Sequence, residues 1–138
     1  MTKRLSTHKT LTDFLEDAKS RISEVDIENA EQLIAQGYKV LDIREPHEYE
    51  TRKIEGSINI PRGVLEPAAD LHFEGANPLL RDSRDAQWLV LCATGGRAAL
   101  ATDTLQYMGF SNVSNIAGGI NAWESAGKEM TSTECIYQ

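Results

Sequence analysis

The sequence has little cysteine, little positive charge and no long hydrophobic run, and each shortage excludes a class of protein. Its 138 residues include only two cysteines, Cys92 and Cys135, which are too few for a disulfide scaffold and are typical of a reducing compartment. No apolar run approaches the roughly 20 residues that span a bilayer, and no apolar signal core follows the basic start. We therefore expect a cytoplasmic protein with no membrane partner. An organelle transit peptide is the weaker alternative.

Acidic residues outnumber basic ones across the chain. There are 21 Asp and Glu residues against 14 Lys and Arg residues, which gives a formal net charge of −7. Such a chain repels a phosphate backbone, so we expect no nucleic-acid partner. A small anionic substrate is still allowed, because a local cluster of backbone N–H groups can override the net charge.

The chain is long enough for one domain with a core of its own. We divide it into an N-terminal extension (residues 1–20), a globular domain (21–130) and a C-terminal tail (131–138). In the extension, apolar residues recur at helical spacing from Leu11 to Ala18. This amphipathic helix is expected to pack on the domain, with a docking or dimerisation role as the alternative.

Within the globular domain, short apolar runs alternate with segments of helical periodicity. The expected strands cover residues 22–25, 39–43, 57–60, 87–91 and 112–116. Helices are expected after Asp26, after Glu45, over 98–108 and over 120–125, and the polar segment 62–86 carries one helical piece around 64–71. The alternation predicts an α/β fold with a parallel sheet flanked by helices on both faces. Ligands bind at the carboxyl ends of the strands in such sheets.

Cys92 follows the expected strand 87–91 and opens a loop of small residues. The loop continues through Ala93, Thr94, Gly95, Gly96 and Arg97. The glycines tolerate positive φ, which lets the backbone curl and point its N–H groups inward. A thiol at this junction also faces the positive end of a helix dipole, which favours the nucleophilic thiolate. Arg97 adds charge or braces the loop from behind. The alternative interpretation of Cys92 is a buried structural cysteine.

Four motifs resemble those of single-domain rhodaneses, a family of sulfurtransferases, and they occur in the family's order. They are Val40–Tyr49, Ile54–Pro61, the loop Cys92–Arg97 and Ala117–Trp123. Together they cover roughly residues 20–130, which is nearly all of the globular domain. The resemblance implies a rhodanese-like fold with a five-stranded parallel sheet and helices on both faces.

The resemblance also implies a catalytic role for Cys92. Cys92 would accept a sulfane sulfur from thiosulfate or a thiol persulfide and pass it to cyanide or a thiol, while Ala93–Arg97 bind the persulfide. No metal or cofactor is implied. The implied partners are small sulfur-containing anions, protein or low-molecular-weight persulfides and a sulfur-acceptor protein. Many members have arginine where this chain has Ala93. That departure removes a cation from the pocket mouth and weakens the case for thiosulfate.

Two other functions compete with sulfur transfer. A non-enzymatic sulfur carrier or a regulatory interaction module could use the same fold, although a docking module does not need Cys92 and both loop glycines. A phosphatase or an arsenate-handling enzyme is disfavoured by loop length. Cysteine phosphatases of similar fold use a Cys-x5-Arg loop, whereas Cys92 and Arg97 are separated by four residues.

Charged residues at two other strand ends complete the candidate site. Asp42 and Arg44 are expected to form an ion pair that braces loops, in preference to direct contact with substrate. Arg62 either supplies the positive charge that Ala93 does not or is solvated. Cys135 in the tail is expected to be a loosely packed thiol, and the alternative is a resolving thiol that attacks a persulfide on Cys92.

Overall fold

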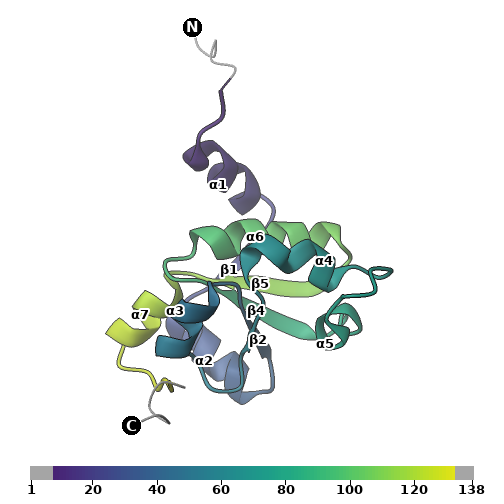
Figure 1. Ribbon diagram of the computed structural model, residues 1–138. Helices are drawn as coiled ribbons and strands as arrows, with labels where there is room; N and C mark the ends of the chain where they lie inside the picture. Colours follow the sequence, from purple (N-terminus) through teal and green to yellow (C-terminus); the bar gives the residue numbers. More distant parts are fainter. Residues whose placement is uncertain (1–7, 133–138) are drawn as a thin grey trace, which may run out of the picture.

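The five predicted strands form one sheet in the order β1-β5-β4-β2-β3 (Figure 1). The computed structural model describes residues 8–132 of the chain. The strands are β1 (Ser23–Val25), β2 (Lys39–Asp42), β3 (Ile58–Asn59), β4 (Gln87–Leu91) and β5 (Asn112–Ile116). Every neighbouring pair is parallel, which confirms the predicted α/β class. Each strand lies within one residue of its predicted bounds.

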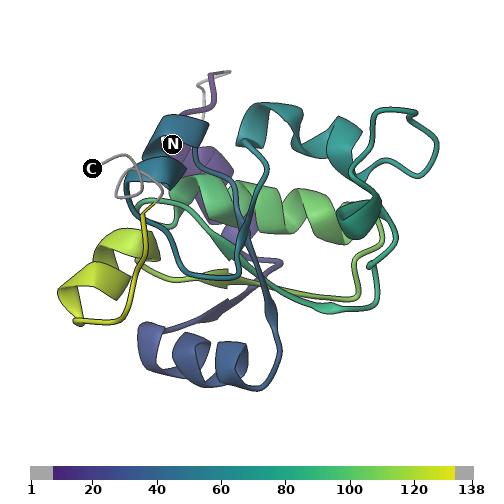
Figure 2. The same ribbon diagram turned by 60° about the horizontal axis from the view of Figure 1, so that its bottom comes forward.

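Helices cover both faces of this sheet, with α2 on one side and α4 to α6 on the other (Figure 2). The helical segments among residues 8–132 are α1 (Leu11–Lys19), α2 (Ile27–Ala35), α3 (Pro46–Thr51), η2 (Arg62–Val64), α4 (Leu65–Ala69), α5 (Pro78–Arg81), α6 (Gly96–Tyr107) and α7 (Gly119–Ser125). Helix α6 starts two residues before its predicted bound, so Gly96 and Arg97 belong to its first turn.

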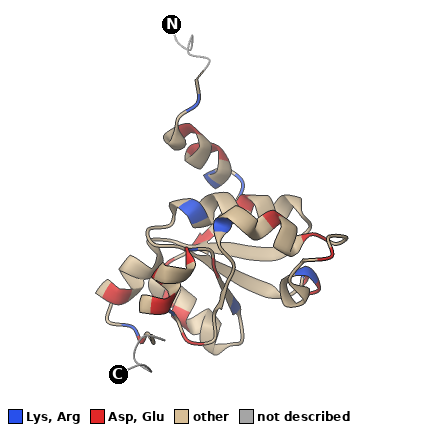
Figure 3. Ribbon diagram, in the orientation of Figure 1, with Lys and Arg blue, Asp and Glu red and all other residues tan. Residues whose placement is uncertain are grey.

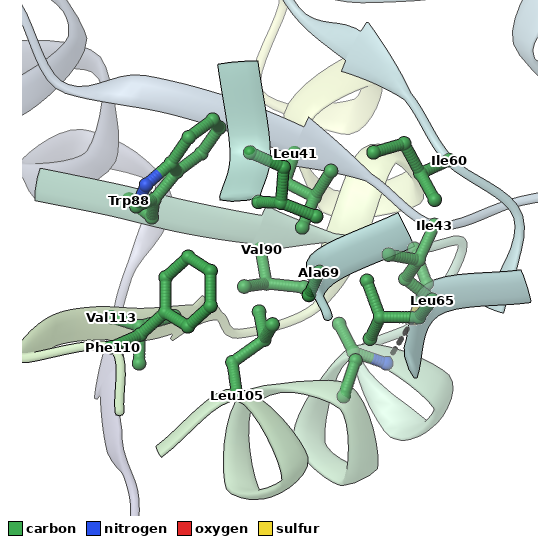
Figure 4. Packing of buried hydrophobic residues seen from close by; sticks show 14 residues of the cluster. Leu41, Ile43, Ile60, Leu65, Ala69, Trp88, Val90, Leu105, Phe110 and Val113 are labelled. Carbon is green, nitrogen blue, oxygen red and sulfur yellow. Dashed lines mark hydrogen bonds between the residues drawn. The ribbon is translucent and has the colours of Figure 1, made fainter. Parts of the chain in front are cut away.

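Alternate residues of β4 supply two separate hydrophobic clusters. Trp88 and Val90 belong to the cluster that packs with α4, α5 and α6 (Figure 4). Leu89 and Leu91 belong to the other cluster and pack with α2 and α7. This period of two is what a strand requires when both of its faces are buried. Cys92 continues the alternation and therefore lies on the same face of the sheet as α6.

The direction in which the chain adds successive strands to the sheet changes between β2 and β4. From β2 the chain moves outward to β3, and from β4 it moves the other way to β5. In open parallel sheets the crevice at such a switch point, at the carboxyl ends of the strands, is where ligands bind. Asp42 ends β2 and pairs in register with Leu91 at the end of β4. The residue after Leu91 is Cys92, so the fold places the candidate nucleophile at the carboxyl end of β4, next to this switch point.

Helix α1 packs against the outer side of α6 (Figure 1). Arg21, just after α1, is ion-paired with Asp17 on α1 and with Asp103 on α6. Leu15 lies 3.9 Å from the position that a Cβ at Gly96 would take. Helix α1 therefore covers the N-terminal end of α6, next to the Cys92 loop. No helix among residues 8–132 is long and apolar enough to cross a membrane.

The polar segment 62–86 contains more helix than its sequence predicted. The expected piece around 64–71 is present as η2 followed by α4, but α5 was missed. Asn77 caps α5 by accepting a hydrogen bond from the Leu80 N–H, and Pro78 occupies its first turn. This cap followed by proline is a helix-start signal that apolar periodicity alone does not detect. Leu80 is fully buried, so the segment extends the core.

Candidate active site

The sulfur of Cys92 receives two backbone hydrogen bonds. The Gly95 N–H donates to Sγ at 3.0 Å, and the Ala98 N–H donates at 3.3 Å. Cys92 is 1% exposed, so its sulfur lies at the floor of the loop and not on the surface. Two N–H donors shielded from water stabilise negative charge on an atom placed between them. A cysteine that only fills space in a core has no need of such donors.

The carbonyl groups at the start of the loop point away from the sulfur, toward α7. The Cys92 carbonyl accepts from the Ile120 N–H at 2.8 Å, and the Ala93 carbonyl accepts from the Asn121 N–H at 3.1 Å. Gly119 has a φ of +62°, and a Cβ at this position would collide with both carbonyl oxygens. The N-terminal turn of α7 therefore engages the acceptors of the loop, which leaves its N–H donors for the sulfur.

The two loop glycines have different conformations. Gly95 has a φ of +108°, in the region that favours glycine, and it is the N-cap of α6. Gly96 does not have a positive φ and is helical. The expectation that both glycines let the loop curl through positive φ is correct for Gly95 and wrong for Gly96. The turn needs only one left-handed residue, because the helix begins directly after it.

Arg97 braces the loop through an ion pair with α3. Its Nη1 and Nη2 atoms donate to the two carboxylate oxygens of Glu48 at 2.9 and 3.1 Å. The hydrogen bonds from Arg97 lower the pKa of Glu48 to about 2, against the opposing effect of burial. The same pairing raises the pKa of Arg97. Of the two expectations for Arg97, the structure therefore favours bracing of the loop, because the guanidinium is paired with a carboxylate on α3.

Asp42 and Arg44 form the predicted ion pair, and it is buried. The Arg44 Nη2 atom lies 2.8 Å from Asp42 Oδ2, with side-chain exposures of 2% and 0%. Arg44 also donates to the carbonyl groups of Glu48 and Arg52 at the two ends of the last turn of α3. A buried charge pair with all of these hydrogen bonds made is structural in character. It fixes α3, which carries the partner of Arg97.

Arg62 is held by neighbouring helices. Its guanidinium pairs with Glu66 of α4 at 2.9 Å and donates to Thr104 Oγ1 of α6 at 3.3 Å. Its charge therefore has a carboxylate partner, and the side chain is not simply solvated. Each arginine that the sequence assigned to the site has a carboxylate partner, because Arg97 pairs with Glu48 and Arg44 with Asp42.

Sequence reasoning missed two contributors to the loop. Glu48 was treated only as part of a helix, although it is the partner of Arg97. Gly119 was treated as a turn residue, although the close approach of the loop carbonyl groups is what requires glycine there. Glu48 lies three residues after the helix N-cap Glu45 and also accepts from the Glu45 N–H at 2.9 Å, so its local sequence indicates a capping contact and gives no signal of the distant one. Cys135 lies outside the described residues, so both hypotheses for it remain untested.

The chain is similar to proteins of one family. A family model described as Rhodanese-like domain matches residues 26–126. Thiosulfate sulfurtransferase 16, chloroplastic, of Arabidopsis thaliana is 33% identical over 114 residues, covering 79% of this chain and 93% of the relative. The putative sulfur carrier protein YrkF of Bacillus subtilis (strain 168) is 30% identical over 106 residues, covering 75% of this chain and 52% of that protein.

A solved structure from Rhodopseudomonas palustris CGA009 has the same architecture. It is described as a protein of unknown function and possible tyrosine phosphatase. It superposes with a TM-score of 0.84 at 33% identity, covering 94% of this chain and 100% of that chain. The matched length exceeds the span of the family model, residues 26–126, on this chain. The likeness therefore extends beyond the residues that the family model matches.

Proposed function

The chain belongs to the rhodanese-like domain family, and from this premise we propose that it is a sulfurtransferase with Cys92 as its nucleophile. In the first half-reaction, the Cys92 thiolate attacks the outer sulfur of a donor. The sulfur–sulfur bond of the donor breaks, the donor leaves with the electron pair (sulfite from thiosulfate, a thiolate from a thiol persulfide), and Cys92 becomes a persulfide. An acceptor then attacks the terminal sulfur, and the Cys92 thiolate is restored. This is two-step covalent catalysis.

One observation carries the proposal, namely the pair of N–H groups that donate to Cys92 Sγ at the start of α6. Cys92 Sγ carries negative charge twice in the reaction, as the attacking thiolate of the first step and as the leaving thiolate of the second. The donors are held in place by the fold, so they stabilise that charge without reorganising. The loop residues Ala93 to Arg97 would serve the same purpose for the persulfide.

Two donor classes fit the site to different degrees. The relative named thiosulfate sulfurtransferase supports thiosulfate. Against it, Ala93 brings no cation, and Arg97 and Arg62 are each paired with a carboxylate. A thiol persulfide needs no sulfonate-binding cation, so we propose a protein or low-molecular-weight persulfide as the preferred donor. A reducing cytoplasm, the compartment that the low cysteine content favours, supplies thiols that can act as the sulfur acceptor in the second step.

A second candidate function is that of a sulfur carrier without turnover of its own. The relative named as a putative sulfur carrier protein favours it. A carrier would load Cys92 in the same way but release the sulfur only to a specific protein. Phosphatase activity has weaker support, despite the description of the solved relative. The loop has four residues between Cys92 and Arg97, and both guanidinium Nη atoms of Arg97 are engaged by Glu48.

The test is to load the protein with thiosulfate and, separately, with glutathione persulfide. We expect a mass increase of about 32 Da, one sulfur atom, on the peptide that contains Cys92. Cyanide or a thiol should then remove the added mass with turnover. Loading without discharge by any small acceptor would identify a carrier. Absence of loading from every donor would overturn the sulfurtransferase proposal, and hydrolysis of an aryl phosphate would then support the phosphatase.

Two cysteine variants serve as matched controls. Cys92→Ser should abolish loading, because a hydroxyl does not form a persulfide. Cys135→Ser should load and discharge at the rate of the unaltered protein if the tail thiol is not involved. A disulfide between the two cysteines after mild oxidation, detected by non-reducing peptide mapping, would instead favour the resolving-thiol hypothesis.

A further inference from the structure

Asn115 on β5 reaches the Cys92 loop from the next strand of the sheet. Its side chain is fully buried, and its Nδ2 atom donates to the Gly95 carbonyl at 3.1 Å. The same Nδ2 atom donates to Glu24 Oε2 at 2.6 Å. Glu24 lies on β1 directly opposite Asn115 in the strand register. Both hydrogens of one amide are therefore used, one toward the loop and one toward a carboxylate on the sheet edge.

The remaining polar atom of this amide has no partner among residues 8–132. Asn115 Oδ1 is buried there without a hydrogen bond. A buried acceptor without a donor is unfavourable, so its presence calls for an explanation. Rotating the amide would not remove the cost, because Oδ1 would then face the Glu24 carboxylate and the Gly95 carbonyl, which are acceptors themselves. The two donated hydrogen bonds are what this asparagine provides.

The hydrogen bond from Asn115 to the Gly95 carbonyl affects Cys92 Sγ indirectly, because the N–H of the same glycine donates to that sulfur. The Gly95 carbonyl accepts both from Asn115 and from the Ala99 N–H, the latter at 3.0 Å. These two donors fix the peptide that follows Gly95, while the peptide that precedes it carries the N–H that points at Cys92 Sγ. Glycine at a φ of +108° has wide rotational freedom, so without an external contact its N–H would sample other directions.

We propose that Asn115, held by Glu24, is a positioning residue that keeps the Gly95 N–H aimed at the sulfur of Cys92. This deepens the proposed function, on which its catalytic meaning rests. The contacts run from Glu24 on the edge strand β1, through Asn115 on β5, to the loop after β4. Helix α7 holds the carbonyl groups of Cys92 and Ala93, and Asn115 holds that of Gly95. Together they turn three acceptors of the loop away from the sulfur.

The test measures how fast Cys92 is alkylated by iodoacetamide as a function of pH, in a Cys135→Ser background that leaves one thiol. This readout reports the stabilisation of the thiolate and does not require sulfur transfer. We expect Asn115→Ala to move the midpoint of the curve to higher pH and to slow alkylation at neutral pH by about threefold to tenfold, because a donor to the charged form is misaligned. Glu24→Ala should act in the same direction with a smaller effect.

Two further variants separate positioning from general stability. Glu24→Gln keeps an acceptor for Asn115 Nδ2 and should stay within about twofold of the parent rate. Ser57→Ala removes a different buried hydrogen bond, from Ser57 Oγ to the Ile54 carbonyl, and should lower the melting temperature without moving the alkylation curve. If Asn115→Ala fails to fold, the pair Glu24→Ala and Glu24→Gln gives the answer, because Glu24 is exposed.

The outcomes distinguish this proposal from the proposed function. If Asn115→Ala lowers the melting temperature as Ser57→Ala does but leaves the alkylation curve in place, Asn115 is only structural and the positioning role is wrong. If Glu24→Ala and Glu24→Gln gave the same alkylation curve, Glu24 would have no part in positioning the Gly95 N–H. If Asn115→Ala shifts the alkylation curve but no sulfur donor loads the parent protein, the positioning role of Asn115 stands. The proposal that the protein is a sulfurtransferase would then be wrong.

Discussion

Gly95 and Gly96 are adjacent in the Cys92 loop, but different physical constraints act on them. Gly95 adopts a φ of +108°, and a Cβ there would lie 3.3 Å from the backbone nitrogen of Gly118. At Gly96 the φ is not positive, and a methyl group added there would meet only the Leu15 methyl groups, at ordinary contact distance. A side chain is therefore excluded at the first position and accommodated at the second.

We expect Gly95→Ala to be destabilising and Gly96→Ala to be tolerated. Left-handed backbone at a non-glycine residue costs roughly 1–3 kcal/mol, and the Gly118 contact adds to it. Gly96→Ala should change the free energy of unfolding by less than about 1 kcal/mol, with a gain as the expected sign, because alanine restricts the unfolded chain. Urea unfolding of the two variants measures the difference. Similar losses at both positions would contradict the assignment of the turn to Gly95.

Single residues also mark the limit of what the sequence could tell. Cys92 and Arg97 were identified because a strand, a run of small residues and a basic residue follow one another along the chain. Asn115 and Gly119 act on the same loop from 20 or more residues away, and nothing in their own neighbourhoods indicates it. Their roles depend on which strands and helices are adjacent in space. Sequence spacing carries no such information for a single chain.

At the scale of elements, α3 connects the interior strand β2 to the Cys92 loop. Arg44 fixes α3 to β2 through the buried pair with Asp42 and through two carbonyl groups of the helix. Glu48 then projects from α3 to Arg97 at the start of α6. Helix α3 has only six residues and no buried side chain, so these ionic contacts, together with the hydrogen bond from the Tyr49 hydroxyl to the Ser57 carbonyl, hold it in place.

The pairing of α3 with α6 should be visible as a pH dependence of stability. Because Arg97 lowers the pKa of Glu48 from 4.5 to about 2, the stabilisation is present above pH 4.5 and is lost as the pH falls toward 2. We expect Glu48→Gln to cost about 1 kcal/mol at pH 6, in the range of a partly exposed pair, and progressively less below pH 4. Urea unfolding between pH 2.5 and 6 measures this.

Glu55→Gln is a suitable control for the pH experiment, because Glu55 is an exposed carboxylate in the turn before β3. It removes one negative charge and leaves the Arg97 contact intact. A Glu48→Gln effect that is constant across the whole pH range would show that the pair does not contribute through ionisation. An equal effect of Glu55→Gln would assign the change to net charge.

Elements were more predictable than the contacts between them. The strands were found because short apolar runs alternate with helical segments, as at Gln87–Leu91, whose predicted and observed bounds are identical. Helix α5 was missed because it has only four residues, too few for a periodic pattern, and its cap was the only signal. The sequence predicted a parallel sheet, and the family resemblance implied five strands, but the order β1-β5-β4-β2-β3 was not predicted, because it depends on which strands pair in space.

At the scale of the whole molecule, the net charge is negative, although the proposed donors and the persulfide are anions. Figure 3 shows acidic residues on α1, α3, α6 and α7, and the chain has a net charge of −7. The arginines nearest the strand ends do not offset this field, because Arg44, Arg62 and Arg97 are each paired with a carboxylate. An approaching dianion therefore meets net repulsion at long range, and attraction begins only at the N–H groups of the loop.

We expect thiosulfate to load Cys92 faster as salt is added. Screening by sodium chloride shortens the Debye length from about 30 Å at 0.01 M to about 8 Å at 0.15 M, which removes most of the repulsion between protein and dianion. A rise in the loading rate of about twofold to fivefold over this range is anticipated. Alkylation by neutral iodoacetamide is the control and should not change. A loading rate that falls with salt would reveal a local positive field.

The strand order has a consequence for the biosynthesis of the protein. The cysteine loop follows β4, but the groups that orient it come from β5 and α7, which are made later. A ribosome adds about 5–20 residues per second, so Cys92 is synthesised roughly one to five seconds before Gly119. On the proposed function, we expect the nascent chain to carry an ordinary thiol during that interval. Cys92 is expected to become reactive only when the later segments dock, so products truncated before β5 should not load sulfur.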